Sequence, residues 1–496
     1  MRSGPRTSSG GRRSLRIVAA LACTLLLASE ARAQGVRGWV GTTIQTVDLR
    51  PIGLDTIAPS ELEQDADGGL TYQGQPVSCP TPTVCTVYAS LDEQRAVVAT
   101  QDVSLTAWGW GLQGLSFTTL LRARARAGGD LVWPRSNDAF DMILGYAQLE
   151  RGRLRVRVGR QEIRSGLGFP AFDGAWASFA VRRYEASAYA GRSLARGLRE
   201  PASEALRPLE RFIPDQSVHL FGGAFHARLG SSTATARYQR EVLADRSGLV
   251  SERASLDFTS TIPGARLLGS LDYDFAFEKV GKGRLSLAAP LAQGRWLVEA
   301  TASRYVPYFE LSTIWGFFEP VSYSEAELRA SWSPGRTLGV WASGGWRSYG
   351  ETRATTVIRP LEDDGWRAGS GVRWQASDTW TVDAVYRLEW GPGAFLSSAD
   401  VGAGYRPSER LAVMFQGTTF QQIEEFRLGD GRAVGGGVSF DLLLTERVSL
   451  SGGASVLRHR DGGTAITSPW NQSRAWTSLR IAVGEDPGLS QRRSRR

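Results

Sequence analysis

The sequence predicts an all-β fold, namely a closed, antiparallel, up-and-down transmembrane β-barrel of about 22 strands. Three features indicate this class: apolar and polar residues alternate in many short segments, short and long connections alternate between those segments, and tryptophans gather at segment ends. The mean hydropathy of −0.22 excludes a bundle of apolar membrane helices. The 57 glycines among 496 residues exceed the usual share of about 7%, as expected for a chain rich in turns.

Residues 1–33 are predicted to be a cleaved secretory signal peptide. Basic residues ending at Arg16 precede the apolar run Ile17–Ala28, and the small residues Ala31 and Ala33 precede a cleavage site before Gln34. The apolar run is shorter than the roughly 20 residues that a membrane-spanning helix needs. An uncleaved helical anchor is the alternative. The expected product is an exported barrel over residues 34–484, followed by a basic periplasmic tail over 485–496.

The basic isoelectric point does not indicate nucleic-acid binding. Without residues 1–33 and the last five residues, the chain holds 48 basic and 49 acidic residues, so the body of the protein is close to neutral. Two cysteines remain after cleavage, Cys79 and Cys85, six positions apart. In an exported chain this spacing predicts one local disulfide, and a metal site is less favoured because no histidine or third cysteine lies nearby.

The strands are read from alternation of period 2. Between Trp380 and Trp390 every second residue is apolar, and the residues between them include Thr381, Asp383 and Glu389. An even number of strands returns both ends to the periplasm, and losing the weakly patterned segments Ala175–Gly191 or Arg284–Ala289 gives 18 or 20 strands instead. The predicted strands are Val36–Asp48, Val97–Gly109, Leu115–Ala127, Phe140–Glu150, Arg153–Ile163, Ala175–Arg182, Tyr184–Gly191, Val218–Leu229, Thr233–Leu243, Val250–Thr259, Ala265–Phe277, Arg284–Ala289, Arg295–Tyr305, Tyr323–Trp332, Thr337–Tyr349, Gly365–Gln375, Trp380–Trp390, Leu396–Tyr405, Leu411–Phe420, Ala433–Leu443, Arg447–Leu457 and Ser473–Val483.

The connections distinguish a barrel from a soluble β-sandwich, which also alternates. Short links such as Arg151–Arg153 and Pro407–Arg410 alternate along the chain with longer ones such as Gly128–Ala139 and Asp461–Trp470. Outer-membrane barrels have tight periplasmic turns and longer outer loops, whereas a sandwich has no reason to keep this asymmetry.

Tryptophans support the same interpretation. Those predicted at periplasmic strand ends are Trp296, Trp332, Trp374 and Trp380, and those at outer ends are Trp346, Trp366 and Trp390. All lie on the apolar face of their own strand. Two belts at the ends of lipid-facing strands are typical of the interfacial girdles of a transmembrane barrel.

One local motif adds a family resemblance. The strand end Val158-Gly159-Arg160-Gln161-Glu162-Ile163, followed by Phe172-Asp173-Gly174, resembles a pattern in bacterial outer-membrane porin-like barrels of the alginate-export-like and large porin-like kind. The resemblance covers about Gln34–Gly484. It implies that nearby loops fold inward to narrow the pore, which makes Arg160, Gln161 and Asp173 constriction candidates. It also implies insertion by the barrel-insertion machinery, although Gly484–Arg496 extends past the last strand.

A closed wall of this size encloses a lumen, which is expected to be open or narrowed by loops because the first strand follows the predicted cleavage site without room for a plug domain. Inward-facing basic residues are predicted on one wall and acidic residues roughly opposite. The predicted pore-lining residues are Arg122, Arg124, Arg126, Arg153, Arg155, Arg157, Glu325, Glu327, Asp383 and Glu389. Such walls either set the selectivity for charged solutes or simply stay hydrated.

The link Pro307–Val321 is rich in aromatic residues, which are costly to expose in water. Tyr308, Phe309 and Trp315 are therefore candidates for a constriction or sugar-stacking surface, or for a cover over the barrel mouth. The amphipathic stretch Ser193–Arg211 raises the same choice.

The motifs of common hydrolases and phosphate-binding loops are missing, so no catalytic residue, metal or cofactor is predicted. The expected protein is an outer-membrane channel for passive diffusion of small hydrophilic solutes, anionic ones included, through a charge-lined lumen narrowed by outer loops. The alternative is a non-conducting structural or surface-binding barrel whose loops bind a partner. Expected partners are outer-membrane lipid, the insertion machinery and small solutes, with no nucleic acid. The sequence does not decide between a monomer and a homo-oligomer.

Overall fold

The computed structural model describes residues 35–484 apart from 51, 65–68, 73–74, 82, 91, 129–138, 164–165, 169, 195–216, 245–247, 307–321, 351–363, 392–393, 424–429 and 463–468. Several predictions fall outside the described residues: the signal peptide, the basic tail, the aromatic link with Tyr308, Phe309 and Trp315, and most of the amphipathic stretch.

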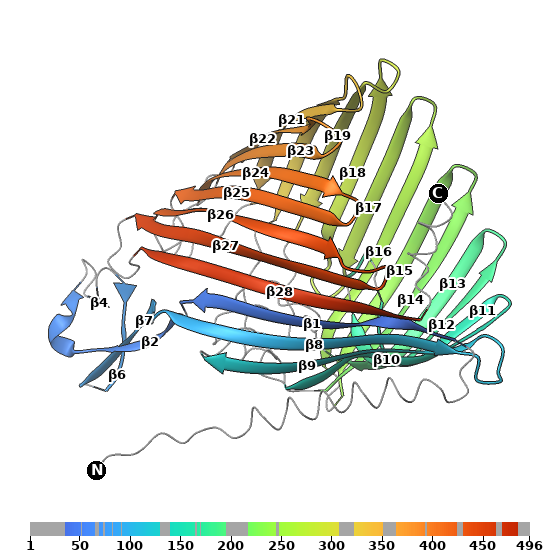
Figure 1. Cartoon of the computed structure of the whole chain (residues 1–496), viewed down its shortest axis with the longest axis horizontal. Helices are drawn as coiled ribbons and strands as arrows, with labels where there is room; N and C mark the ends of the chain where they lie inside the picture. The colour runs from blue at the N-terminus through green and yellow to red at the C-terminus, as the bar shows by residue number, and fades with distance from the viewer. Residues whose placement is uncertain are drawn as a thin grey trace, which may run out of the picture.

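A single closed sheet of 22 antiparallel strands forms the body of the protein (Figure 1). Each strand from β8 to β28 pairs with the next along the chain, and β1 closes the ring by pairing with both β28 and β8. The predicted fold class and the count of 22 strands are confirmed. The strands are β1 (Gly35–Leu49), β8 (Gln94–Trp108), β9 (Leu115–Gly128), β10 (Phe140–Arg151), β11 (Leu154–Glu162), β12 (Ala171–Val181), β13 (Tyr184–Ser193), β14 (Val218–Leu229), β15 (Ser232–Leu243), β16 (Leu249–Ile262), β17 (Ala265–Asp274), β18 (Lys279–Leu291), β19 (Trp296–Tyr305), β20 (Tyr323–Trp332), β21 (Leu338–Tyr349), β22 (Asp364–Gln375), β23 (Trp380–Gly391), β24 (Ala394–Ser408), β25 (Leu411–Ile423), β26 (Asp430–Leu443), β27 (Val448–Gly462) and β28 (Trp470–Gly484).

The two weakly patterned segments are regular strands. β18 is longer than predicted, because Gly281, Gly283 and Pro290 interrupt the alternation of side chains without preventing the backbone from pairing with β17 and β19. A register shift between Asp272 and Tyr273 accommodates the irregular start of this pairing.

The wall has two chemically distinct faces. Trp346, Trp366 and Trp390 lie directly opposite one another on adjacent strands and are 39–49% exposed. The same face carries Leu328 (57% exposed) and Val401 (53%). We call this apolar side the outer face, because so much exposed apolar surface around a closed wall fits lipid. The opposite side is the inner face.

Two-residue hairpin turns connect the strands at one end of the barrel. The connections at 152–153, 182–183, 230–231 and 263–264 have two residues each, and Gly152, Arg182, Gly230 and Gly264 take left-handed backbone conformations there. Such hairpins match the twist of the flanking strands. Both ends of the described wall, Gly35 and Gly484, lie at this same end, because β1 and β28 pair there.

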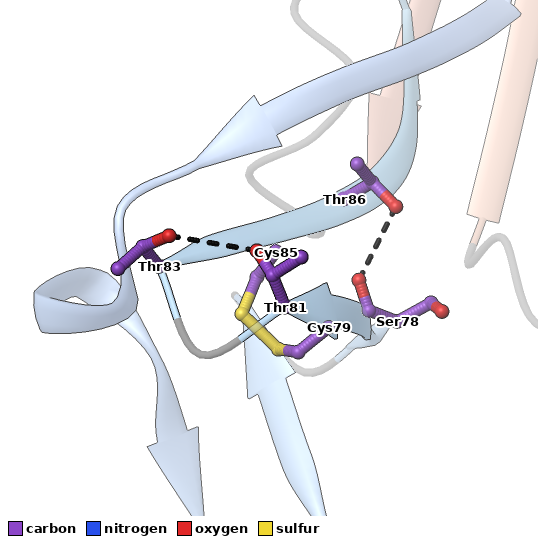
Figure 2. The surroundings of a disulfide bond; sticks show 6 residues. All are labelled: Ser78, Cys79, Thr81, Thr83, Cys85 and Thr86. Carbon is purple, nitrogen blue, oxygen red and sulfur yellow. Dashed lines mark hydrogen bonds between the residues drawn. A yellow bond between two sulfur atoms is a disulfide. The ribbon is translucent and has the colours of Figure 1, made fainter.

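The long first link forms a small body of its own at the other end (Figure 1). One sheet has the order β2 (Ile52–Ile57), β7 (Val84–Ser90), β6 (Ser78–Thr81), and a second has the order β3 (Glu63–Gln64), β4 (Leu70–Tyr72), β5 (Gln75–Pro76). A disulfide joins Cys79 to Cys85, the pairing expected from their spacing, and Figure 2 shows the threonine and serine hydrogen bonds around it. We call residues 52–90 the outer body.

The described part of the chain contains no helix that is long and apolar enough to cross a membrane.

Candidate functional site

The predicted basic row on β9 lies on the inner face. Arg122, Arg124 and Arg126 have the parity opposite to Phe117, which is 44% exposed on the outer face. Arg122 lies opposite Asp102 of β8 and binds its carboxylate with two hydrogen bonds of 2.7 and 3.0 Å. This bidentate geometry holds the guanidinium against the wall rather than extending it into the lumen.

The second basic row has two strand residues instead of three. Arg155 and Arg157 lie on the inner face of β11, whereas Arg153 belongs to the tight turn that precedes the strand. Arg155 pairs with Glu150 at 3.2 Å. The guanidinium of Arg157 donates to Gln148 at 2.7 Å and lies over the rings of Tyr146 and Trp176 at 5.2 and 4.9 Å.

The opposite wall is a network of both signs. Glu325 of β20 accepts from Arg347 of β21 at 3.0 Å and from Arg367 of β22 at 2.7 Å. Glu389 of β23 accepts from the same two arginines, at 2.7 and 3.1 Å. The two predicted acidic residues are therefore each neutralised by two arginines from neighbouring strands. The ring order places this network about half-way round the barrel from β9 and β11.

The other two predicted acidic residues lie apart from this network. Glu327 lines a groove of about 560 Å³ on the inner face of β16–β20, together with Asp257, Glu299, Arg284 and Arg329. Asp383 is opposite Arg373 in the pairing of β22 with β23.

Residues 166–168, between β11 and β12, lie against the inner face of β16. The backbone carbonyl of Leu167 accepts a hydrogen bond of 3.1 Å from Arg253 of β16, and Leu167 is only 2% exposed. A Cβ built on Gly166 would lie 2.9 Å from the carboxylate of Asp257 and 3.2 Å from Arg237. Arg253 and Arg237 are themselves paired with Asp272 and Asp257. Residues 166–168, which we call the inward loop, thus reach β16, which is four strands further round the ring than β12.

Gln161 supports the base of the inward loop. Its side chain is 1% exposed, and its amide donates to the carbonyl of Gly174 at 3.1 Å. Beside it, Phe172, Tyr189 and Leu220 form an apolar cluster on the inner face. A packed cluster here gives the loop a fixed attachment.

Arg160 and Asp173 are placed differently from the expectation that they narrow the pore. They lie on β11 and β12, opposite each other in the pairing, and share the outer face with Val158 and Phe179, which are 56% and 49% exposed. Arg160 binds Asp173 at 2.8 and 2.9 Å. The correction has a simple cause: Arg160 is an odd number of residues from Arg157, and side chains alternate along a strand.

Four further inner-face residues were not among those predicted from the sequence, namely Arg347, Arg367, Asp102 and Arg253. Each of the four is an odd number of residues from an outer-face residue of its own strand, so alternation applied to every residue of these strands places all four on the inner face. Their partners are set by the pairing of neighbouring strands and by the path of the inward loop, which alternation within one segment does not reveal.

The three histidines, all of which are described, lie apart from one another. His219 lies on the outer face of β14, His226 on its inner face beside Thr235 at 2.9 Å, and His459 stacks on Trp470 at 4.7 Å. Over the described part of the chain, no three His, Cys, Asp or Glu residues are grouped to hold a metal ion.

Comparison with known proteins gives the fold and little more. No protein-family model and no curated protein matches this chain. Among solved structures, the siderophore receptor PirA from Pseudomonas aeruginosa is similar at a TM-score of 0.50 with 13% identity, covering 90% of this chain and 80% of that one. A ferric enterobactin receptor (PfeA) mutant from the same organism has a TM-score of 0.48 with 11% identity, covering 90% and 80%. A BenF-like porin from Pseudomonas fluorescens Pf-5 has a TM-score of 0.42 with 10% identity, covering 91% and 100%. The likeness to PirA shows a shared β-barrel fold.

Proposed function

We propose that this protein is an outer-membrane channel that passes small hydrophilic solutes, anionic ones included, by passive diffusion. The observation that carries the proposal is the contrast between the two faces of a closed 22-strand wall, apolar outside and charged inside. Barrels of about 16–18 strands already leave an aqueous channel, and those of 22 strands enclose a wider lumen, which in outer-membrane transporters is plugged. No enzyme activity is part of this proposal.

The inward loop supports a lumen that is narrowed at one level. It is held at two places: near its base, where Gln161 and the apolar cluster pack beside β11, and at Leu167, whose carbonyl accepts from Arg253 of β16. A segment held in this way has little freedom to swing out of the lumen, so a solute passes beside it. Size selection at this level follows from the fixed position of its backbone.

Charge selection in this proposal comes from the unequal composition of the walls. The β9 and β11 wall carries five inner-face arginines in two rows, and three carboxylates, Asp102, Asp141 and Glu150, lie opposite members of these rows in the strand pairing. The β20–β23 network has equal numbers of both signs. The excess of positive charge on one wall favours anions and creates a transverse field that orients dipolar solutes.

The second candidate function is a non-conducting barrel that binds a partner at its surface. The outer body favours it, because its two small sheets, one of them containing the disulfide between β6 and β7, project from the barrel end opposite the tight turns. Residues 51–94 carry seven Asp and Glu and no Lys or Arg, so a partner of basic character would fit this segment best. Location in the outer membrane and the use of the insertion machinery belong to both candidates.

Conductance in planar lipid bilayers separates the two. Purified, folded full-length protein is added to one chamber in potassium chloride, and single-channel steps are recorded. Discrete steps of constant size are the expected result. A folded protein that inserts, as shown by protection from protease in vesicles, and never conducts would overturn the channel proposal and leave the partner-binding barrel.

A further inference from the structure

The structure assigns a binding site for a phosphorylated lipid headgroup to the outer face of β26 and β27, where Arg432, Arg458 and Arg460 form a cluster. We call these three residues the arginine cluster. This inference goes beyond the proposed function, because it concerns the side of the wall that faces lipid and does not depend on conduction through the lumen.

The strand pairing brings the three side chains together. Arg432 lies directly opposite Arg460, and Val434 lies directly opposite Arg458. Exposure alternates from Gly431 to Ser439 of β26, with Arg432, Val434 and Val438 on the exposed side. Val434 and Val438 are each 42% exposed, and Val456 on β27 is 52% exposed, which places the whole group on the outer face.

The cluster holds an excess of positive charge. In the part of the chain that the structure describes, none of the three guanidinium groups forms an ion pair, and the flanking residues in the pairing are the uncharged Gln421 and Asn471. Asp430 is the nearest acidic residue along β26, and counting it still leaves a net charge of +2. Like charges directly opposite each other on paired strands are destabilising, so an anion from outside the wall stabilises this arrangement.

The level of the cluster matches the border of the membrane. On β22, Trp366 and Trp374 belong to the two aromatic belts and are eight residues apart. Along β26, Arg432 is also eight residues from Phe440, which is near the tight-turn end, so Arg432 is at the level of the other belt. The tight connection 444–447 lies at the other end of these strands. The arginines are thus at the end opposite the tight turns, with exposed valines immediately below them on the membrane side.

This layout fits a lipid headgroup better than a free anion. Guanidinium groups bind phosphate oxygens in bidentate pairs, and three of them match one or two phosphate groups. The valines below offer apolar surface to acyl chains, a contact that inorganic phosphate cannot use. The ligand class is therefore a phosphorylated glycolipid or phospholipid of the outer leaflet.

Native mass spectrometry of the full-length protein in detergent tests the site. The probes are a bisphosphorylated lipid A, the same lipid after removal of both phosphates, and inorganic phosphate. The wild type is expected to retain bisphosphorylated lipid at least tenfold more than dephosphorylated lipid. The triple variant R432Q/R458Q/R460Q is expected to lose this preference, and R432K/R458K/R460K is expected to keep part of it, since charge remains while bidentate binding is lost.

The matched control is R336Q/R406Q/R410Q, which removes three exposed arginines near the tight-turn end. It is expected to bind lipid like the wild type. Equal retention of phosphorylated and dephosphorylated lipid by the wild type would overturn the inference, as would an equal loss in the control triple. Binding of inorganic phosphate that competes fully with the lipid would show a simple anion site rather than a lipid site. Conductance is expected to be unchanged in the glutamine triple, so failure here is distinguishable from failure of the channel.

Discussion

The guanidinium of Arg253 donates a 3.1 Å hydrogen bond to the carbonyl of Leu167, which lies 86 residues earlier in the chain. This contact fastens the inward loop to a strand that is not its neighbour. Leu167 is 2% exposed in the same place, so burial of its side chain adds to the hydrogen bond. Leu167 therefore contributes to the position of the loop through both its backbone carbonyl and its buried side chain.

Loosening this attachment is expected to widen the channel. In L167A the loop loses most of its buried apolar side chain, a truncation that costs about 2–5 kcal/mol at fully buried positions. Single-channel conductance in planar bilayers is expected to rise and become noisier. The control L256A removes the same atoms from the outer face, where Leu256 is 46% exposed, and is expected to leave conductance unchanged. An L167A channel with the conductance of the wild type would show that the loop does not limit flow.

Neutralising the β9 arginines is expected to shift selectivity toward cations. The triple variant R122Q/R124Q/R126Q removes three positive charges from the inner face and leaves the carboxylate of Asp102 without the bidentate partner it has in the structure. The reversal potential under a tenfold potassium chloride gradient measures the effect. An unchanged reversal potential would mean that this row is hydrated lining without influence on ion choice.

The ion network on the opposite wall is expected to stabilise the barrel. In R347M, Glu325 and Glu389 each lose one of two guanidinium partners, and Glu325 is nearly buried at 8% side-chain exposure. The free energy of unfolding in urea is expected to fall by about 3 kcal/mol, at the lower end for breaking a buried pair. R387M is the control, because Arg387 pairs with Asp400 at 3.5 Å with both side chains at least half exposed, and such pairs contribute at most about 1 kcal/mol. Equal losses in the two variants would contradict the structure of the network.

The assignment of the two faces can be tested by placing one charge on each. L328R puts an arginine on the outer face near the middle of β20, where Leu328 is 57% exposed, and is expected to lower stability in lipid vesicles by about 2–4 kcal/mol. T301R puts it on the inner face of the neighbouring strand, where Thr301 is paired with Glu327, and is expected to cost little. A larger loss of stability in T301R than in L328R would mean that the inner and outer faces are assigned the wrong way round.

The disulfide is expected to act on the outer body alone. C79S/C85S removes a bond that closes a short loop, which is worth about 2 kcal/mol in the chain-entropy model. Residues 52–90 are then expected to become sensitive to protease added outside intact vesicles, while the barrel keeps its heat-resistant migration in gels and its conductance. Loss of barrel folding in this variant would show that the outer body helps to close the wall between β1 and β8.

Local alternation determined most of the wall. The period of two along each segment fixed which residues share a face, so the 22 strands, the two tryptophan belts and the inner-face positions of Arg122 and Glu325 followed from the sequence by itself. The same alternation also places Arg160 on the outer face. The family resemblance, which implied that Arg160 narrows the pore, gave the wrong face for this residue.

Only the tertiary structure decided which charges meet and where the inward loop goes. Arg347 lies between Glu325 and Glu389 because β20, β21 and β23 are held at particular offsets, and those offsets arise from the closure of the whole ring. The contact of Leu167 with Arg253 and the pairing of Arg432 with Arg460 have the same origin. Side-chain alternation is a property of a few consecutive residues, whereas register and loop path depend on distant strands, so a single segment does not contain them.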